Sequence, residues 1–198
     1  MKTAAFGFRM HSGWGVLVAV SGDTDSMEVV HRCRIEVIDP SLPGGKQPYH
    51  YAAELSPGKS EQHISSCSVV SETMALSAIG VTLQELKVRQ YRIKSAAVLM
   101  ASGHALPPLP EILASHPLIH TAEGEFFRNA VMKACAELKI AVEQIREREL
   151  NDRAESAFGK KSVPVLRRIA GMGADLGPPW TADHKAAALA ALLTLENR

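Results

Sequence analysis

The chain has 198 residues, of which 46% are hydrophobic and 22% are charged, a composition typical of a single globular domain. Its 22 basic and 21 acidic residues leave a formal net charge of +1. The chain therefore lacks a long-range positive field, which argues against strong nonspecific nucleic-acid binding but leaves a local basic patch open. Its three cysteines are widely spaced and form no Cys-x-x-Cys pair, so we expect reduced thiols rather than a cysteine-ligated zinc.

The sequence shows no sign of a targeting or membrane segment. Met1-Lys2-Thr3 leads into the first predicted strand without a long apolar run or a small-residue cleavage site. No window reaches about eighteen uncharged apolar residues, the length that a membrane helix needs. We therefore expect a soluble cytoplasmic protein with no membrane partner.

The first part of the chain predicts a three-stranded antiparallel meander. Residues 6–20 place apolar residues on both sides of Ser12-Gly13-Trp14-Gly15, a pattern typical of a β-hairpin. Residues 27–39 are rich in β-branched residues and predict a third strand. Residues 40–57 carry four prolines and the pair Gly44-Gly45, which predicts an extended loop leading out of the sheet.

The remainder of the chain predicts alternating helices and strands. Residues 60–90 have helical spacing, although Gly80 and the capping box that follows it leave two consecutive helices open. A turn at Ser102-Gly103-His104 follows the next strand. Predicted strands cover 94–100 and 140–145, and predicted helices cover 111–115, 121–138, 146–158, 164–175 and the segment from Thr181 nearly to the end. This order indicates an α/β fold with a mixed sheet and helices on both faces.

Two short motifs carry a family resemblance. Gly7 in the first strand and Ser12-Gly13-Trp14-Gly15 in the turn resemble the opening hairpin of the ribonuclease H-like superfamily, in its Holliday-junction-resolvase branch. The order of elements is similar as well. The resemblance implies a single domain over 1–198, with 40–57 as an extended loop and 149–198 as a helical segment that completes the fold. The turn is about three residues shorter than in that branch, and Arg9 stands where the family has an aspartate.

The resemblance also implies a site chemistry. The superfamily holds two divalent cations, Mg²⁺ or Mn²⁺, between carboxylates of the first strand, the fourth strand or its exit, and the last helix. Glu123, with Glu125 close behind, and Asp183 are the candidates here for catalysis and metal binding. The alternative is that all three acids mark helix starts, where the macrodipole favours them, and that Glu125 pairs with Arg128.

Arg9 changes this expectation because a guanidinium cannot ligate a metal and stays protonated. We expect Arg9 to replace the metal charge by pairing with Glu123 or Asp183, in a site that binds an anionic ligand or is purely structural. The alternative is an Arg9 that points into solvent. Under the first interpretation, the candidate ligand-binding residues are Arg9, His11, His120 and Lys185.

Other polar residues give weaker signals. His50, His104, His116 and His120 lack a His-Glu-x-x-His or comparable spacing, so we expect loop or packing roles, with His120 as the exception because it precedes Glu123. A triad of His11, Ser12 and Asp183 has no Gly-x-Ser-x-Gly elbow to support it. Glu72 is a further candidate carboxylate, although a solvated helix glutamate is the commoner role.

Two functional hypotheses follow. The first is a metal-dependent nuclease or nucleic-acid-processing domain that uses Glu123 and Asp183. The second is a noncatalytic protein of the same fold, whose former site is closed by ion pairs and which binds an anionic ligand, a nucleic acid, a protein or a second copy. The balanced charge and Arg9 favour the second hypothesis.

Overall fold

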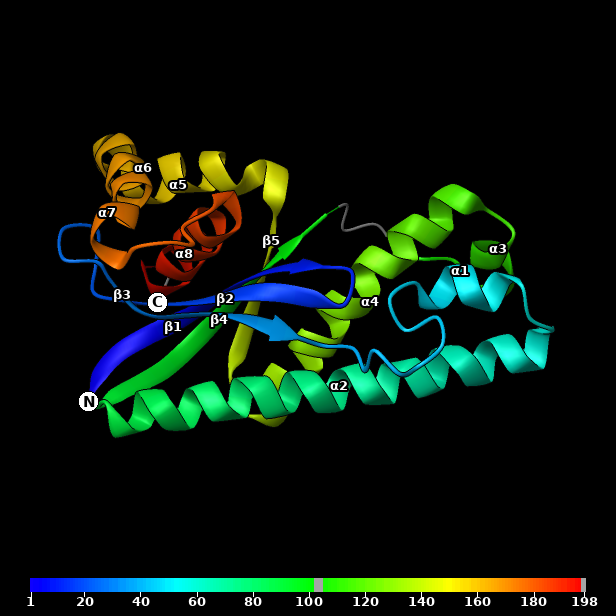
Figure 1. Cartoon of the computed structure of the whole chain (residues 1–198). Helices are drawn as coiled ribbons and strands as arrows, with labels where there is room; N and C mark the ends of the chain where they lie inside the picture. Colours follow the sequence, from blue (N-terminus) through cyan, green and yellow to red (C-terminus); the bar gives the residue numbers. More distant parts are fainter. Residues whose placement is uncertain (102–104, 197–198) are drawn as a thin grey trace.

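The computed structural model describes residues 1–101 and 105–196, which form an α/β fold. A five-stranded sheet runs in the order β3-β2-β1-β4-β5 (Figure 1). β2 pairs antiparallel with β1 and with β3, whereas β4 pairs parallel with β1 and with β5. The predicted meander followed by parallel strands is confirmed. The strands are β1 (Lys2–His11), β2 (Trp14–Ser21), β3 (Glu28–Glu36), β4 (Tyr91–Met100) and β5 (Ala141–Arg146).

The predicted hairpin turn lies between β1 and β2, where His11 pairs with Trp14. Gly13 has a φ of +81°, a conformation that residues with a side chain rarely adopt. A Cβ atom at Gly13 would also press on the side chain of Ile38. The glycine in the turn is therefore required by both the backbone conformation and the packing.

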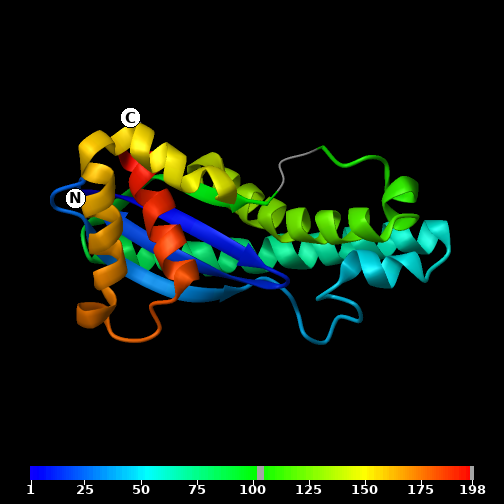
Figure 2. The same cartoon turned by 90° about the horizontal axis from the view of Figure 1, so that it is seen from above.

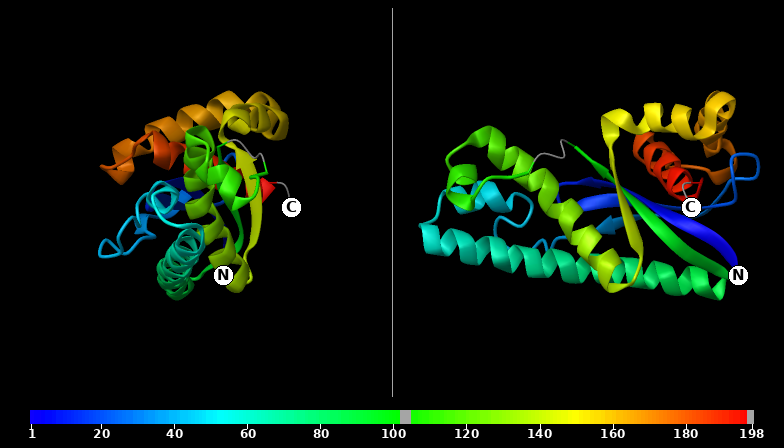
Figure 3. Two further views of the ribbon diagram at one scale, coloured as in Figure 1. Left: turned by 90° about the vertical axis from the view of Figure 1, so that its right-hand side faces the viewer. Right: turned by 180° about the vertical axis from the view of Figure 1, so that it is seen from behind.

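Helices cover both faces of the sheet, as the sequence predicts. α2 and α4 pack on one face, and α8 crosses the other face with α5 and α6 behind it (Figure 3). Short 3-10 turns flank α5 at η1 (Glu147–Glu149) and η2 (Gly159–Lys161). The helices are α1 (Pro48–Ala53), α2 (Pro57–Val88), α3 (Leu109–Leu113), α4 (His116–Glu137), α5 (Leu150–Phe158), α6 (Ser162–Gly171), α7 (Gly173–Leu176) and α8 (Ala182–Glu196).

Prolines explain two differences from the predicted elements. The segment 40–57, expected to be irregular, contains α1, which begins at Pro48 because a proline fits the first turn of a helix. For the same reason α4 begins at His116 with Pro117 in its first turn, earlier than the predicted start at Thr121. The turn expected at Ser102-Gly103-His104 lies outside the described residues.

The segment 60–90 forms one helix rather than two. Gly80 lies inside α2 with no atom near its missing Cβ, so it interrupts nothing. Among the described helices, α2 alone is long and apolar enough to cross a membrane, a test that the core helix of a soluble protein also passes. Its residues Cys67, Ile79 and Leu86 are buried in the core.

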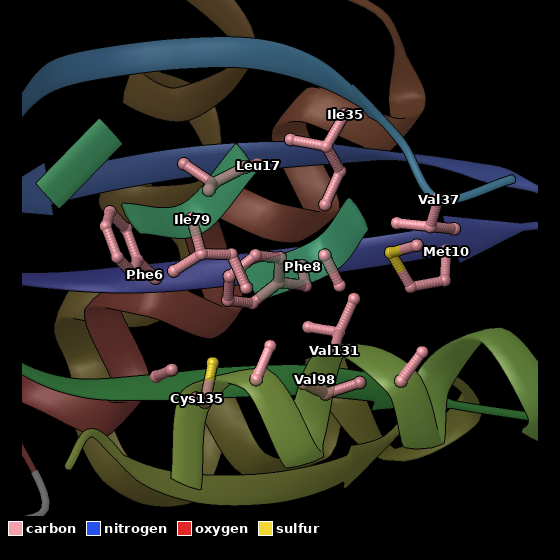
Figure 4. Packing of buried hydrophobic residues seen from close by; sticks show 14 of the residues in the cluster. Phe6, Phe8, Met10, Leu17, Ile35, Val37, Ile79, Val98, Val131 and Cys135 are labelled. Atoms are coloured by element: carbon pink, nitrogen blue, oxygen red, sulfur yellow. The ribbon is translucent and has the colours of Figure 1, made fainter. Parts of the chain in front are cut away.

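Two apolar clusters lie on opposite faces of the sheet because side chains alternate along each strand. Phe6, Phe8 and Met10 of β1 belong to the cluster under α2 and α4 (Figure 4). Ala5 belongs to the cluster under α8, and Gly7 contacts α8 directly. The same alternation places Arg9 on the α8 face, at the end of the strand.

Candidate functional site

The candidate site lies at one edge of the sheet, where the carboxyl ends of the parallel strands β1, β4 and β5 meet. Ligand sites of α/β sheets favour this edge. Arg9 and His11 are among the last residues of β1, and Glu147 directly follows β5. Asp183 lies in the first turn of α8, as predicted. Four side chains from both ends of the chain therefore meet at this edge, and we call them the Arg9 cluster.

The Arg9 guanidinium joins two carboxylates. Its Nε–H and Nη2–H donate to Oε1 of Glu147 at 2.9 and 2.5 Å, and its Nη1–H donates to Oδ1 of Asp183. The Arg9 and Asp183 side chains are only 26% and 17% exposed. The predicted ion pair with Asp183 is thus confirmed, and the alternative of an Arg9 pointing into solvent is wrong.

His11 forms a hydrogen bond with the second oxygen of Asp183. Its Nε2–H donates to Oδ2 of Asp183 at 3.0 Å, and its ring stacks on Trp14 with centroids 4.3 Å apart. Burial holds the pKa of His11 below its ordinary value, and the charges of Arg9 and Arg128 lower it further. His11 is therefore neutral near pH 7 and serves as a hydrogen-bond donor rather than as a second cation.

Arg128 brings a second guanidinium to this edge. From α4 its Nε–H donates to the carbonyl of Leu99 at 2.8 Å, and its Nη1–H donates to the carbonyl of Gly124. Burial lowers the pKa of Arg128, and the charges of Glu125 and Glu147 oppose that shift. Glu125 forms no ion pair with Arg128 among the described residues, contrary to the predicted pairing, and its Oε1 is buried without a hydrogen-bond partner there.

These residues do not fit the two divalent cations that the family resemblance implies. Each oxygen of Asp183 already accepts a hydrogen bond, one from Arg9 and one from His11. Oε1 of Glu147 accepts from Arg9 as well. A fixed positive charge lies between the two acids and repels any cation that approaches them. The Arg9 cluster is therefore an ion-paired site rather than a two-metal centre.

The other predicted site residues have different locations. Glu123 is buried in α4 and accepts hydrogen bonds from the backbone N–H and the ring Nδ1–H of His50, at 3.2 and 2.9 Å. The structure thus does not bring Glu123 to Arg9 or Asp183. Glu123 faces α1 instead, and because α4 begins at His116, it lies outside the first turn of that helix. His120 lies beside Glu123 on α4. Lys185 is half-buried on α8, in the same turn as Asp183.

Glu72 has an ordinary structural role. Its Oε1 accepts from Lys133 Nζ and from Ser68 Oγ, both at 2.5 Å, which joins α2 to α4. The sequence does not predict two residues at this edge of the sheet, Glu147 and Arg128. The sequence predicts a polar helix around Glu147, although its place just beyond a parallel strand could have indicated the site. Arg128 gave no such signal.

The order of strands, the meander and the last helix laid across the sheet define a ribonuclease H-like fold. Among solved structures, the chain is similar to RuvC of Thermus thermophilus in complex with a Holliday junction substrate, with 13% identity over 99% of this chain and 93% of that chain and a TM-score of 0.52. A second RuvC structure from Thermus thermophilus gives 13% identity over 99% and 94%, with a TM-score of 0.50. No protein-family model matches the sequence, and no curated protein matches it significantly. The predicted resemblance to the Holliday-junction-resolvase branch is confirmed at the level of the fold.

Proposed function

We propose that this chain is a noncatalytic ribonuclease H-like protein that binds nucleic acid without cutting it. The observation that carries the proposal is the Arg9 guanidinium, which bridges Asp183 and Glu147 at the edge where this fold would hold metal ions. An arginine at this position supplies the charge that keeps the acids together. Unlike a metal ion, it has no coordination position at which a water molecule could be activated. The site is thereby stable and inactive.

A pocket beside the Arg9 cluster supports a nucleic-acid ligand. It has a volume of about 350 Å³, and its lining includes Trp14, Arg32, Arg34 and Asp183. The Arg34 guanidinium lies 3.8 Å from the centre of the Trp14 ring. His11 and Arg34 cover the two faces of the Trp14 ring, so no face is left for a base, and the pocket instead offers the exposed Arg34 guanidinium to a phosphate. The solved RuvC complex contains a Holliday junction, which makes branched DNA the first ligand to test.

The net charge of +1 shapes the expected binding. Nonspecific affinity for nucleic acid comes mainly from neutralised phosphates, and a chain with balanced charge has no long-range positive field to attract them. We therefore expect recognition of DNA shape through local contacts, with a weak dependence on salt. The nuclease hypothesis has less support because the two acids it needs, Glu123 and Asp183, are held by different partners.

The test compares binding and cleavage on the same substrates. Fluorescence anisotropy with four-way-junction, duplex and single-stranded DNA and RNA should show preferential binding of the branched form. Gels of the same mixtures with Mg²⁺ or Mn²⁺ should show no products. The Trp14→Ala variant should bind more weakly, because the Trp14 ring holds the Arg34 guanidinium in the pocket lining.

The control is Tyr51→Ala, because Tyr51 is an exposed aromatic residue on α1 and does not line this pocket. This variant should bind as the wild type does if it remains folded by circular dichroism. Metal-dependent cleavage that disappears in Asp183→Asn would establish the nuclease hypothesis instead. Failure to bind any of the nucleic acids would overturn the proposed ligand.

A further inference from the structure

Three histidines meet at the end of the molecule away from α8. His116 and His120 lie one turn apart on α4, and His50 faces them from α1. One nitrogen from each ring lies within 4.8 Å of the other two. The ring centroids are 4.5 to 5.3 Å apart, and each pair of rings is steeply inclined, at 66° to 89°. We call these residues the histidine cluster.

The sequence predicts loop or packing roles for His50 and His116, and the structure brings both rings together with His120. Two imidazoles at positions i and i+4 of a helix share one face, and a third from another element completes a set of three nitrogen donors. A tetrahedral zinc ion with Zn–N distances of about 2.0–2.1 Å needs its nitrogens roughly 3.3 Å apart. His116 and His120 are exposed, so rotations of their side chains can close the remaining distance.

Glu123 orients the third ring. Because a carboxylate only accepts hydrogen bonds, the 2.9 Å contact with His50 fixes the proton on Nδ1 and leaves Nε2 as a free lone pair. Histidines that bind metals usually donate their other N–H to a carboxylate in this way, which raises the basicity of the ligand. Glu123 is 4% exposed, and a cation held by His50 would complement its buried charge.

We propose that His50, His116 and His120 bind one zinc ion, with Glu123 as the positioning residue behind His50. Three neutral imidazoles suit zinc better than Mg²⁺ or Mn²⁺, which prefer oxygen ligands. The fourth coordination position faces solvent and takes water. α1 packs against α4 at this end of the molecule (Figure 2), so the ion joins the two helices and fixes the segment 40–57 against the body of the protein. This zinc site is independent of the Arg9 cluster and of any nucleic-acid ligand.

The first test measures zinc on tag-free, metal-stripped protein. Isothermal titration should give one Zn²⁺ per chain, and Co²⁺ should give the visible absorption of a four- or five-coordinate nitrogen site. Zinc should also slow proteolysis within residues 40–57, because it holds α1 in place. Absence of saturable zinc binding by the wild-type chain overturns the proposal.

The second test assigns the ligands. His116→Ala and His120→Ala change exposed positions, so both variants should stay folded while losing zinc affinity and the Co²⁺ spectrum. Glu123→Gln should weaken binding by about 10- to 100-fold, the effect typical of a carboxylate behind a ligand. His31→Ala is the control, because His31 lies on β3 beside Glu85 and should leave zinc binding unchanged. Full binding by the double variant of His116 and His120 contradicts the assignment.

Discussion

At the scale of single residues, the chemistry of the candidate site depends on the sign of the charge at the end of β1. Arg9 places a delocalised cation between Asp183 and Glu147, and Arg128 adds a second one nearby. Carboxylates held this close repel one another unless a positive charge lies between them. The guanidinium neutralises these acids as a metal does in a two-metal site, but it has no coordination position for a water molecule or a phosphate oxygen.

Reversing that charge should restore cation binding. In Arg9→Asp, a carboxylate replaces the guanidinium beside Glu147 and Asp183, which creates an oxygen-rich set of the kind that Mn²⁺ prefers. We expect the variant to be less stable than the wild type without metal, and Mn²⁺ to raise its melting temperature. Thermal shift and titration calorimetry measure both effects.

Arg9→Ala is the control for this experiment, because it removes the cation without adding an oxygen ligand. It should lose stability and respond only weakly to Mn²⁺. A melting temperature of Arg9→Asp that does not depend on Mn²⁺ would show that the acids are not placed as a metal site requires.

His11 predicts how stability depends on pH. Its pKa in the folded protein is below the ordinary value of 6.5, mainly because of burial, so the unfolded chain binds a proton more readily than the folded one. The contribution of His11 to the free energy of unfolding should therefore be complete above pH 6.5 and should decrease as the pH falls below that value. His31 and His184 are shifted in the same direction and add to the effect.

Urea unfolding at about pH 7.5 and about pH 5.5 measures the decrease, since this window spans the ordinary histidine pKa. His11→Asn cannot titrate here and should show a smaller decrease than the wild type. An equal decrease in both proteins would remove His11 from the explanation.

At the scale of elements, the close contact between β1 and α8 is the feature that the sequence indicates best. Ala187, Ala188, Ala190 and Ala191 are fully buried on α8, and a Cβ at Gly7 would collide with the backbone carbonyl of Ala187. Small residues on both elements let the backbone of the helix approach the strand. This contact also sets the position of Asp183 in the first turn of α8, next to Arg9.

Gly7→Ala should therefore be strongly destabilising. The added methyl group meets backbone, which cannot move aside as a side chain can, and we expect a loss of roughly 1–3 kcal/mol or more. Gly80→Ala is the matched control, because Gly80 lies inside α2 with nothing near its missing Cβ. That change should stabilise the protein by roughly 0.5–1 kcal/mol. Chemical denaturation of both variants checks the prediction, which a tolerated Gly7→Ala would contradict.

The same scale shows why some elements could be predicted and others could not. The hairpin follows from apolar strands around Ser12-Gly13, a purely local pattern. The sequence does not predict the starts of α1 and α4, because a proline such as Pro48 or Pro117 is typical of a loop as well as of the first turn of a helix. Gly80 suggested a stop for a similar reason, but packing along the sheet keeps α2 continuous.

At the scale of the whole molecule, the Arg9 cluster and the histidine cluster differ in how much of each can be predicted from the sequence. The pairing of Arg9 with Asp183 is predicted from the resemblance to the ribonuclease H-like superfamily. Glu147 lies at the end of a parallel strand, and Arg128 lies on α4. Only the tertiary structure brings these elements to the same edge of the sheet. Spacing along α4 could have indicated His116 and His120, but nothing local relates them to His50.

The position of α8 has a consequence for how the protein is made. β1 is covered by α8, and Arg9 stays without Asp183 until residues 182–196 have left the ribosome. Folding of this sheet must therefore wait until α8 has been synthesised, whereas many domains can begin from their amino-terminal end. During that interval the uncovered face of β1 and β2 is the surface that a chaperone would have to shield.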